Sequence, residues 1–178
     1  PRVVSDGKSL LLDSRTAGDE PYMLAANLKD VPVVVDKDRV KSGKHAISEL
    51  NCDTLLLDDG LQYLRLKHRL DIVLIDRWQP FGTGRLLPRG TLREPAKNLK
   101  RASYLFITKS NDQPNDELVE KIRTLNRTAE IIECEHRPRY LQHIETRATQ
   151  PLESLQGKRV GTVSAIAVPE SFEDGVRK

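Results

Sequence analysis

Two adjacent aspartates, Asp58 and Asp59, directly follow the apolar residues 54–57 and precede a glycine. An apolar strand that ends in aspartate is typical of the Walker B element of phosphate-transfer enzymes, where the carboxylate holds Mg²⁺ directly or through water. Neighbouring carboxylates repel each other unless a cation or hydrogen bonds intervene, which favours a metal ion over simple solvation. The alternative is an Asp-Asp-Gly turn that closes the strand, and on these residues alone the two interpretations are equally supported.

A second candidate is the long loop predicted over residues 79–95, whose segment 81–95 contains three arginines and three glycines. Glycine lets the backbone approach a ligand closely, and the arginine fork matches a phosphate group bidentately. Loops of this length in compact domains tend to be functional. The alternative is a surface loop with solvated arginines.

A Walker B element requires a phosphate-binding loop, but the pattern G-x-x-x-x-G-K-[ST] is absent from these 178 residues. The nearest segment, residues 42–45, has Asp38 in place of the first glycine and His45 in place of the metal-binding hydroxyl. It lies in an amphipathic helix pattern, so we expect Lys44 to be solvated surface. Either the phosphate-binding loop precedes Pro1, or the kinase interpretation is wrong.

The elements that would position these residues alternate between strands and helices. Helical periodicity occurs over residues 38–50 and 115–125, a helix is expected to begin near Asp19, and an Asp-Gly turn predicts a hairpin over residues 3–12. The sequence therefore predicts an α/β fold with a mainly parallel sheet flanked by helices. The alternation weakens after residue 136, so residues 1–136 are expected to form the central part of the main domain. Residues 137–178 are expected to begin a C-terminal subdomain or to continue the sheet. The predicted strands are the apolar runs 31–35, 54–57, 71–75, 104–108, 129–134 and 159–163.

Composition excludes several classes of protein. Charged residues make up 31% of the chain, but the net charge is only +3 and basic residues are interspersed with acids, which argues against a dedicated nucleic-acid binder. The two cysteines, Cys52 and Cys134, form no metal or disulfide pattern, so a reducing compartment is expected. No run of eighteen apolar residues and no signal peptide occur. Because the chain begins with Pro1 and ends soon after a predicted helix start, we expect it to be part of a longer protein.

Read together, five motifs closely resemble the tetraacyldisaccharide 4'-kinases, which phosphorylate the lipid A precursor. The resemblance covers nearly the whole chain, and its most specific parts are the DDGLQ motif and the arginine-glycine loop. The motifs are AGDEPYMLA (17–25), VPVVVDKDRV (31–40), LLLDDGLQYLRLKHRLDIVLID (55–76), FGTGRLLPRGTLREP (81–95) and SAIAVPESF (164–172).

This resemblance implies a P-loop-kinase-like fold that is incomplete at its N-terminus here, since the family's Walker A loop would lie upstream of Pro1. It implies transfer of the γ-phosphate of ATP, with Mg²⁺, to the 4'-hydroxyl of a disaccharide 1-phosphate lipid at the cytoplasmic face of the bacterial inner membrane. The partners implied are the glycolipid and the membrane surface, and the 178-residue chain alone is expected to be inactive. By motif, the resemblance implies a catalytic base at Asp19, Mg²⁺ ligands at Asp58 and Asp59, the latter also catalytic, and substrate or phosphate contacts at Glu20, Arg39, Gln62, Arg85 and Arg93.

Two positions depart from the family pattern. Tyr63 stands where the family usually has histidine after DDGLQ, and Val168 replaces a polar residue that in some members is a histidine supporting the catalytic carboxylate. These departures keep two alternatives open: a non-catalytic paralogue that binds nucleotide or glycolipid, and a P-loop kinase with another small acceptor. The four histidines are expected to be surface or structural residues, with His68 the one to check because it follows the DDGLQ motif closely.

Overall fold

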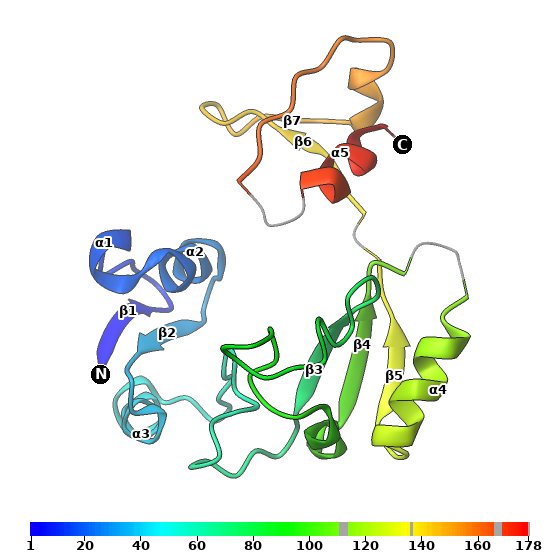
Figure 1. Ribbon diagram of the computed structural model, residues 1–178. Helices are drawn as coiled ribbons and strands as arrows, with labels where there is room; N and C mark the ends of the chain where they lie inside the picture. Colours follow the sequence, from blue (N-terminus) through cyan, green and yellow to red (C-terminus); the bar gives the residue numbers. More distant parts are fainter. Residues whose placement is uncertain (111–113, 136, 166–168, 178) are drawn as a thin grey trace.

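The computed structural model describes residues 1–110, 114–135, 137–165 and 169–177. Its centre is a parallel three-stranded sheet in the order β3 (Ile72–Asp76), β4 (Tyr104–Thr108) and β5 (Glu130–Glu133), with helix α4 (Asp116–Leu125) connecting the last two strands (Figure 1). The strands pair in register, Ile72 opposite Tyr104 and Tyr104 opposite Glu130. The predicted α/β class with a parallel sheet flanked by helices is therefore confirmed.

The core lies on one face of this sheet. Leu105 and Ile107 alternate inward along β4, and both are fully buried together with Ile122 of α4. The short 3-10 helix η1 (Ala96–Arg101) adds Leu99 to the same cluster, so α4 and η1 cover the same face. On the other side of β3, Leu74 is 70% exposed, so within the described structure this part of the sheet is open.

The N-terminal part forms a second, two-stranded sheet. Strand β1 (Arg2–Asp6) pairs antiparallel with β2 (Pro32–Val35), and the helices α1 (Ser14–Ala17), α2 (Asp19–Asn27) and α3 (Arg39–Leu50) surround the pair (Figure 1). Helix α3 begins where Asp38 accepts hydrogen bonds from the backbone N–H groups of Val40 and Lys41, an N-cap that satisfies otherwise unpaired donors.

Downstream of the central sheet, the described residues form a smaller unit. Strands β6 (Leu141–Gln142) and β7 (Thr149–Gln150) pair antiparallel, followed by the 3-10 helix η2 (Leu152–Leu155) and helix α5 (Pro169–Arg177). The division at residues 136 and 137 stays a prediction. No helix among the described residues has the length and apolar character needed to cross a bilayer.

Three sequence predictions of strands or hairpins are wrong. Residues 54–57 form no strand, and Leu56 is 94% exposed, because no described strand lies beside them to accept their backbone hydrogen bonds. Residues 159–163 also form no strand, and the side chain of Val163 is 97% exposed. The hairpin over residues 3–12 is reduced to one bridge between Ser5 and Leu10, since β1 pairs with β2 instead.

The helices predicted over residues 38–50 and 115–125, the helix start at Asp19 and the long loop over residues 79–95 are confirmed. The strands predicted at 71–75, 104–108 and 129–134 are confirmed, and every end agrees within one residue. The run 31–35 forms a strand, but one that is antiparallel to β1 and only half-buried, because it joins the separate N-terminal sheet.

Candidate functional site

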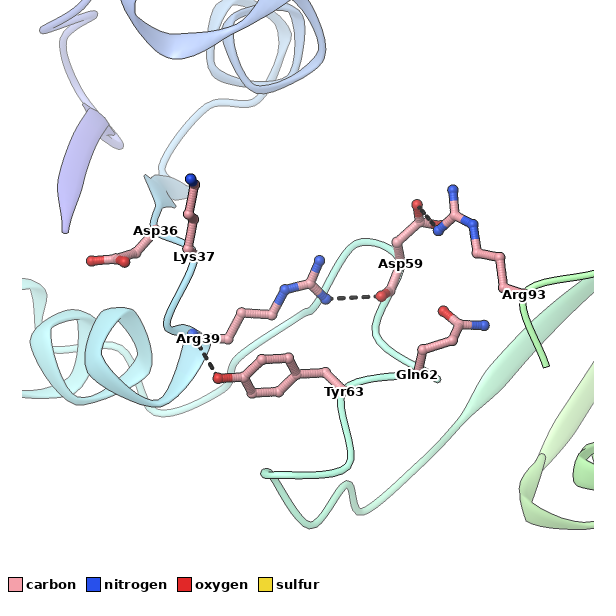
Figure 2. A pocket seen from close by; sticks show the side chains of 7 residues that line it. All are labelled: Asp36, Lys37, Arg39, Asp59, Gln62, Tyr63 and Arg93. Atoms are coloured by element: carbon pink, nitrogen blue, oxygen red, sulfur yellow. Dashed lines mark hydrogen bonds and ion pairs between the residues drawn. The ribbon is translucent and has the colours of Figure 1, made fainter. Parts of the chain in front are cut away.

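A cavity of about 520 Å³ lies where three segments distant in the sequence meet (Figure 2). The connection from β2 to α3, the turn after residues 54–57 and the end of the long loop each contribute side chains to its wall. Three cations and two carboxylates line it, giving a net positive charge that suits an anionic ligand. The lining residues are Asp36, Lys37, Arg39, Asp59, Gln62, Tyr63 and Arg93.

Asp59 is the centre of this arrangement. Its backbone has a φ of 49°, the left-handed conformation that aspartate tolerates better than most residues. Its carbonyl oxygen accepts a hydrogen bond from the Arg39 guanidinium at 2.8 Å, and its carboxylate accepts one from Arg93 at 2.7 Å (Figure 2). Two arginines from different segments therefore converge on one aspartate.

The electrostatics match this geometry. The hydrogen bond and charge of Asp59 raise the pKa of Arg93, and the charge of Asp58 adds to the effect. The Arg93 and Asp59 side chains are 58% and 62% exposed, so the pair is open to solvent. An exposed ion pair contributes little to stability, and its partners are free to exchange for a ligand.

Tyr63 contacts Arg39 through both its ring and its hydroxyl group. The guanidinium carbon of Arg39 lies 5.5 Å from the centre of the Tyr63 ring, and the backbone N–H of Arg39 donates to the Tyr63 hydroxyl at 3.2 Å. The hydroxyl in turn donates to Asp38 at 3.3 Å, and Asp38 forms an ion pair with Arg65 at 3.4 Å. Tyr63 thus joins the cap of α3 to the turn that holds Asp59.

The pKa of Asp38 is lowered, mainly because the backbone N–H of Lys41 donates to its carboxylate. Arg65, the backbone N–H of Val40 and the Tyr63 hydroxyl add to this effect and outweigh the opposing effect of partial burial. The capping carboxylate therefore stays ionised at neutral pH.

A second set of contacts fixes the long loop against the same turn. Glu94 pairs with Arg101 at 2.7 Å and accepts a hydrogen bond from Asn98 at 2.7 Å. Arg101 also donates to the carbonyl oxygen of Leu61 at 3.1 Å, and Gln62 donates to Glu94 at 3.4 Å. Arg93, which precedes Glu94, is thereby held beside Asp59.

Of the residues singled out from the sequence, four come together in the cavity: Arg39, Asp59, Gln62 and Arg93. Asp58 is exposed beside Asp59 and lies within electrostatic range of Arg93. Arg85 is exposed on the long loop and is not among the lining residues. Asp19 and Glu20 occupy the first turn of α2, where acids suit the helix dipole, and neither lines the cavity. Their roles stay predictions.

Sequence reasoning missed Lys37, the support role of Tyr63 and the Glu94–Arg101 pair. The sequence did mark Tyr63 as unusual, because it stands where the family usually has histidine after the DDGLQ motif. His68 pairs with Asp71 at 2.7 Å with both side chains largely buried, which makes it structural as expected. His136 and the departure at Val168 lie outside the described residues.

The carboxylates near the cavity are the candidate ligands for a metal ion. Within the described residues no group of three or more His, Cys, Asp or Glu side chains comes together. Asp58 and Asp59 supply two adjacent exposed carboxylates, and Mg²⁺ is usually held by one or two carboxylates together with water and substrate phosphates. The residues present fit a magnesium ion that binds together with a phosphorylated ligand.

Comparison with known proteins gives a consistent result. A family model described as tetraacyldisaccharide-1-P 4'-kinase matches residues 1–178. Proteins named tetraacyldisaccharide 4'-kinase are 38% identical in Halothermothrix orenii, 42% in Elusimicrobium minutum and 40% in Anaeromyxobacter dehalogenans. These matches cover 97%, 91% and 96% of this chain and 48%, 44% and 46% of the respective relatives, so the chain spans about half the length of the curated relatives it matches. No solved structure matches the chain.

Proposed function

Because the chain belongs to the tetraacyldisaccharide 4'-kinase family, we propose that the whole protein transfers the γ-phosphate of ATP to the 4'-hydroxyl of a tetraacyldisaccharide 1-phosphate in lipid A biosynthesis. The reaction would take place at the cytoplasmic face of the bacterial inner membrane, with the glycolipid as acceptor.

One observation supports this proposal above the others: Arg39 and Arg93 converge on Asp59 in a positively charged cavity. Phosphoryl transfer requires positioned cations around the moving phosphate and carboxylates that hold Mg²⁺. Both kinds of group are present within one cavity and its rim. A purely stabilising role does not account for these groups, because the exposed Arg93–Asp59 ion pair contributes little to the free energy of folding.

The residues then take distinct roles. ATP supplies the phosphoryl group, and bound Mg²⁺ would neutralise the charge that develops on it. Asp58 makes no hydrogen bond or ion pair with any described residue, so it is the more available metal ligand, whereas Asp59 also orients Arg93. Arg39, Arg93 and Gln62 contact phosphate or the acceptor. Lys37 adds a third cation to the cavity wall.

Asp19 is proposed as the base that takes the proton of the acceptor hydroxyl, with Glu20 beside it contacting substrate. The pair lies on the exposed first turn of α2, where a carboxylate can meet a ligand that enters from solvent. Arg85 is proposed to contact substrate or phosphate from the long loop.

The finer features of the fold belong to the same proposal. The parallel sheet would be part of a P-loop-kinase-like domain, with residues 1–136 as its central part and residues 137–178 either beginning a C-terminal subdomain or continuing the sheet. The phosphate-binding loop would come from a part of the protein outside these residues, since G-x-x-x-x-G-K-[ST] does not occur among them. The 178-residue chain alone is then expected not to catalyse phosphoryl transfer.

The test is a phosphoryl-transfer assay on the full-length protein with ATP, Mg²⁺ and the tetraacyldisaccharide 1-phosphate. The expected product carries a new phosphate at the 4' position, identified by mass spectrometry and phosphorus NMR. Binding of nucleotide or glycolipid without transfer would contradict the proposal and favour a non-catalytic paralogue. Transfer only to a different acceptor would favour a kinase of another substrate class.

A further inference from the structure

The middle of the long loop exposes two leucines between two arginines. Residues 85–90, here called the loop tip, read Arg-Leu-Leu-Pro-Arg-Gly, and the side chains of Leu86 and Leu87 are 43% and 61% exposed. Arg85 and Arg89 are exposed on either side of them. Single exposed leucines are common on protein surfaces, so the pair needs a second observation to carry meaning.

The backbone of the loop tip is a closed turn. The N–H of Leu87 donates to the carbonyl of Leu92 at 2.9 Å, that of Leu92 to Arg85 at 3.1 Å, and that of Gly90 to Leu86 at 3.0 Å. A Cβ at Gly90 would collide with the carbonyl oxygen of Arg85 and the side chain of Thr83. The leucines are therefore displayed by a compact, hydrogen-bonded turn rather than by an open chain.

The charge around the leucines supplies the second observation. Residues 82–93 include three arginines and no acid, and neither Arg85 nor Arg89 forms an ion pair with another residue that the structure describes. Apolar side chains flanked by unpaired cations are the chemistry of protein segments that lie in a membrane interface. The apolar groups enter the boundary between headgroups and acyl chains, and the cations meet lipid phosphates.

The loop tip is also coupled to the cavity. Leu86 bridges to Leu92, and the next residue, Arg93, binds Asp59 inside the cavity. A surface that held the loop tip would therefore lie near the site, where an acceptor embedded in that surface presents its headgroup.

We propose that the loop tip docks on an anionic lipid bilayer, with Leu86 and Leu87 at the headgroup boundary and Arg89 against lipid phosphates. That the bilayer is also the place of reaction rests on the proposed function, since a glycolipid acceptor would be embedded in a membrane beside the cavity. The docking itself is a property of the loop and is tested without turnover.

The experiment is vesicle co-sedimentation of the 178-residue chain with phosphatidylcholine alone and with phosphatidylcholine mixed with phosphatidylglycerol. We expect binding to the anionic vesicles, weakened at least about tenfold by L86S/L87S and about fivefold by R89Q. The matched controls are L10S/L11S, whose leucines are 46% and 52% exposed, and R127Q at another exposed arginine. Each control is expected to change binding less than about twofold, because those side chains lie outside the loop tip.

A fluorescence variant checks the depth of the contact. Trp78 is the only tryptophan in the chain, so Trp78→Phe combined with Leu87→Trp places the sole indole at the loop tip. We expect its emission to shift to shorter wavelength with anionic vesicles and to remain unchanged with neutral ones.

Three results would overturn the proposal: no binding of the chain to anionic vesicles, equal losses in L86S/L87S and L10S/L11S, or binding only when the glycolipid acceptor is present. The last would assign the leucines to the acyl chains of the substrate. Circular dichroism melting of each variant shows that a loss of binding is not a loss of fold.

Failure of the docking and failure of the proposed function are distinguishable. In the full-length protein, L86S/L87S is expected to keep its turnover on detergent-dispersed acceptor and to lose it on acceptor held in vesicles. If no variant and no unsubstituted protein phosphorylates the lipid while vesicle binding follows the expected pattern, the proposed function is wrong and the docking stands.

Discussion

Asp76 directly follows an apolar run and Asp59 stands one residue beyond another, after Asp58, yet the structure uses the two aspartates differently. Each binds a cation, Arg93 at 2.7 Å for Asp59 and Lys109 at 2.6 Å for Asp76. Asp76 ends a hydrogen-bonded strand and also accepts the backbone N–H groups of Trp78 and Gln79. Asp59 lies in a left-handed turn, is 62% exposed and lines the cavity.

The difference teaches how to separate a structural aspartate from one available to a ligand. The carboxylate of Asp76 accepts hydrogen bonds from the backbone N–H groups of Trp78 and Gln79 and from Lys109. These contacts fix the chain where it leaves β3 and enters the long loop. Among the described residues, Asp59 receives hydrogen bonds only from side chains of other segments, and it remains open to solvent. Disrupting Asp76 should therefore affect stability, and disrupting the Asp58–Asp59 pair should affect catalysis.

The largest effect is expected for Asp58→Ala in the full-length protein. Loss of a magnesium ligand should lower kcat by at least about a hundredfold, because the metal acts on the transition state. The melting temperature should stay within about 2 °C, since Asp58 is exposed and pairs with no described residue. Steady-state kinetics and calorimetry measure both, with Asp53→Ala as the exposed control, and an unchanged kcat would mean that Asp58 only forms a turn.

Arg93→Gln should have the next largest effect. It removes the charge that pairs with Asp59, so kcat/KM for the lipid acceptor is expected to fall by about ten- to a hundredfold. Arg127→Gln is the matched control, because it removes another exposed arginine, one that does not line the cavity. Equal kinetics of the two variants would remove Arg93 from the site.

Asp76 should contribute to the pH dependence of stability. Partial burial acts to raise its pKa, but Lys109 and the N–H groups of Trp78 and Gln79 outweigh it, so the pKa lies below the ordinary value of 3.8. The stabilisation is therefore present above that value and is lost as the pH falls through the lower pKa of the folded state. Asp76→Asn should lower the free energy of unfolding by about 1 kcal/mol at pH 7 and by less near pH 2. Urea unfolding at both pH values measures the difference, and equal losses would contradict it.

Tyr63→Phe should give the smallest effect. It keeps the ring beneath Arg39 but removes the hydroxyl that joins Arg39 and Asp38. We expect a loss of about threefold in kcat with a KM for ATP within about twofold, since the ring still supports the guanidinium. Tyr63→Ala removes both contacts and should cost more. A Tyr63→Ala variant with unchanged kinetics would show that Tyr63 does not position Arg39.

Local patterns predicted much of the fold. The helices α3 and α4 followed from apolar spacing, and β3, β4 and β5 from continuous apolar runs. The run 54–57 is also continuous and mainly apolar but forms no strand, because pairing depends on a neighbouring strand that the local sequence does not reveal. The antiparallel pairing of β2 was missed for the same reason.

The site was predictable only in part. Asp59 and Arg93 were candidates from their sequence surroundings, Arg39 and Gln62 from the family resemblance, and the structure brings these four together. The contact of Tyr63 with Arg39 and the pair of Glu94 with Arg101 join residues 24 and 7 positions apart, and no local spacing rule predicts them. Asp19 and Arg85 lie outside the cavity wall, so their roles still rest on the resemblance.

The most direct test of the account compares Asp59→Asn and Asp76→Asn in the full-length protein, measuring kcat for 4'-phosphorylation and the urea midpoint of each variant side by side. We predict that Asp59→Asn lowers kcat by about a hundredfold at an unchanged midpoint, and that Asp76→Asn lowers the midpoint with kcat within about threefold. A larger loss of kcat in Asp76→Asn than in Asp59→Asn would contradict the assignment of the cavity around Asp59 as the catalytic site.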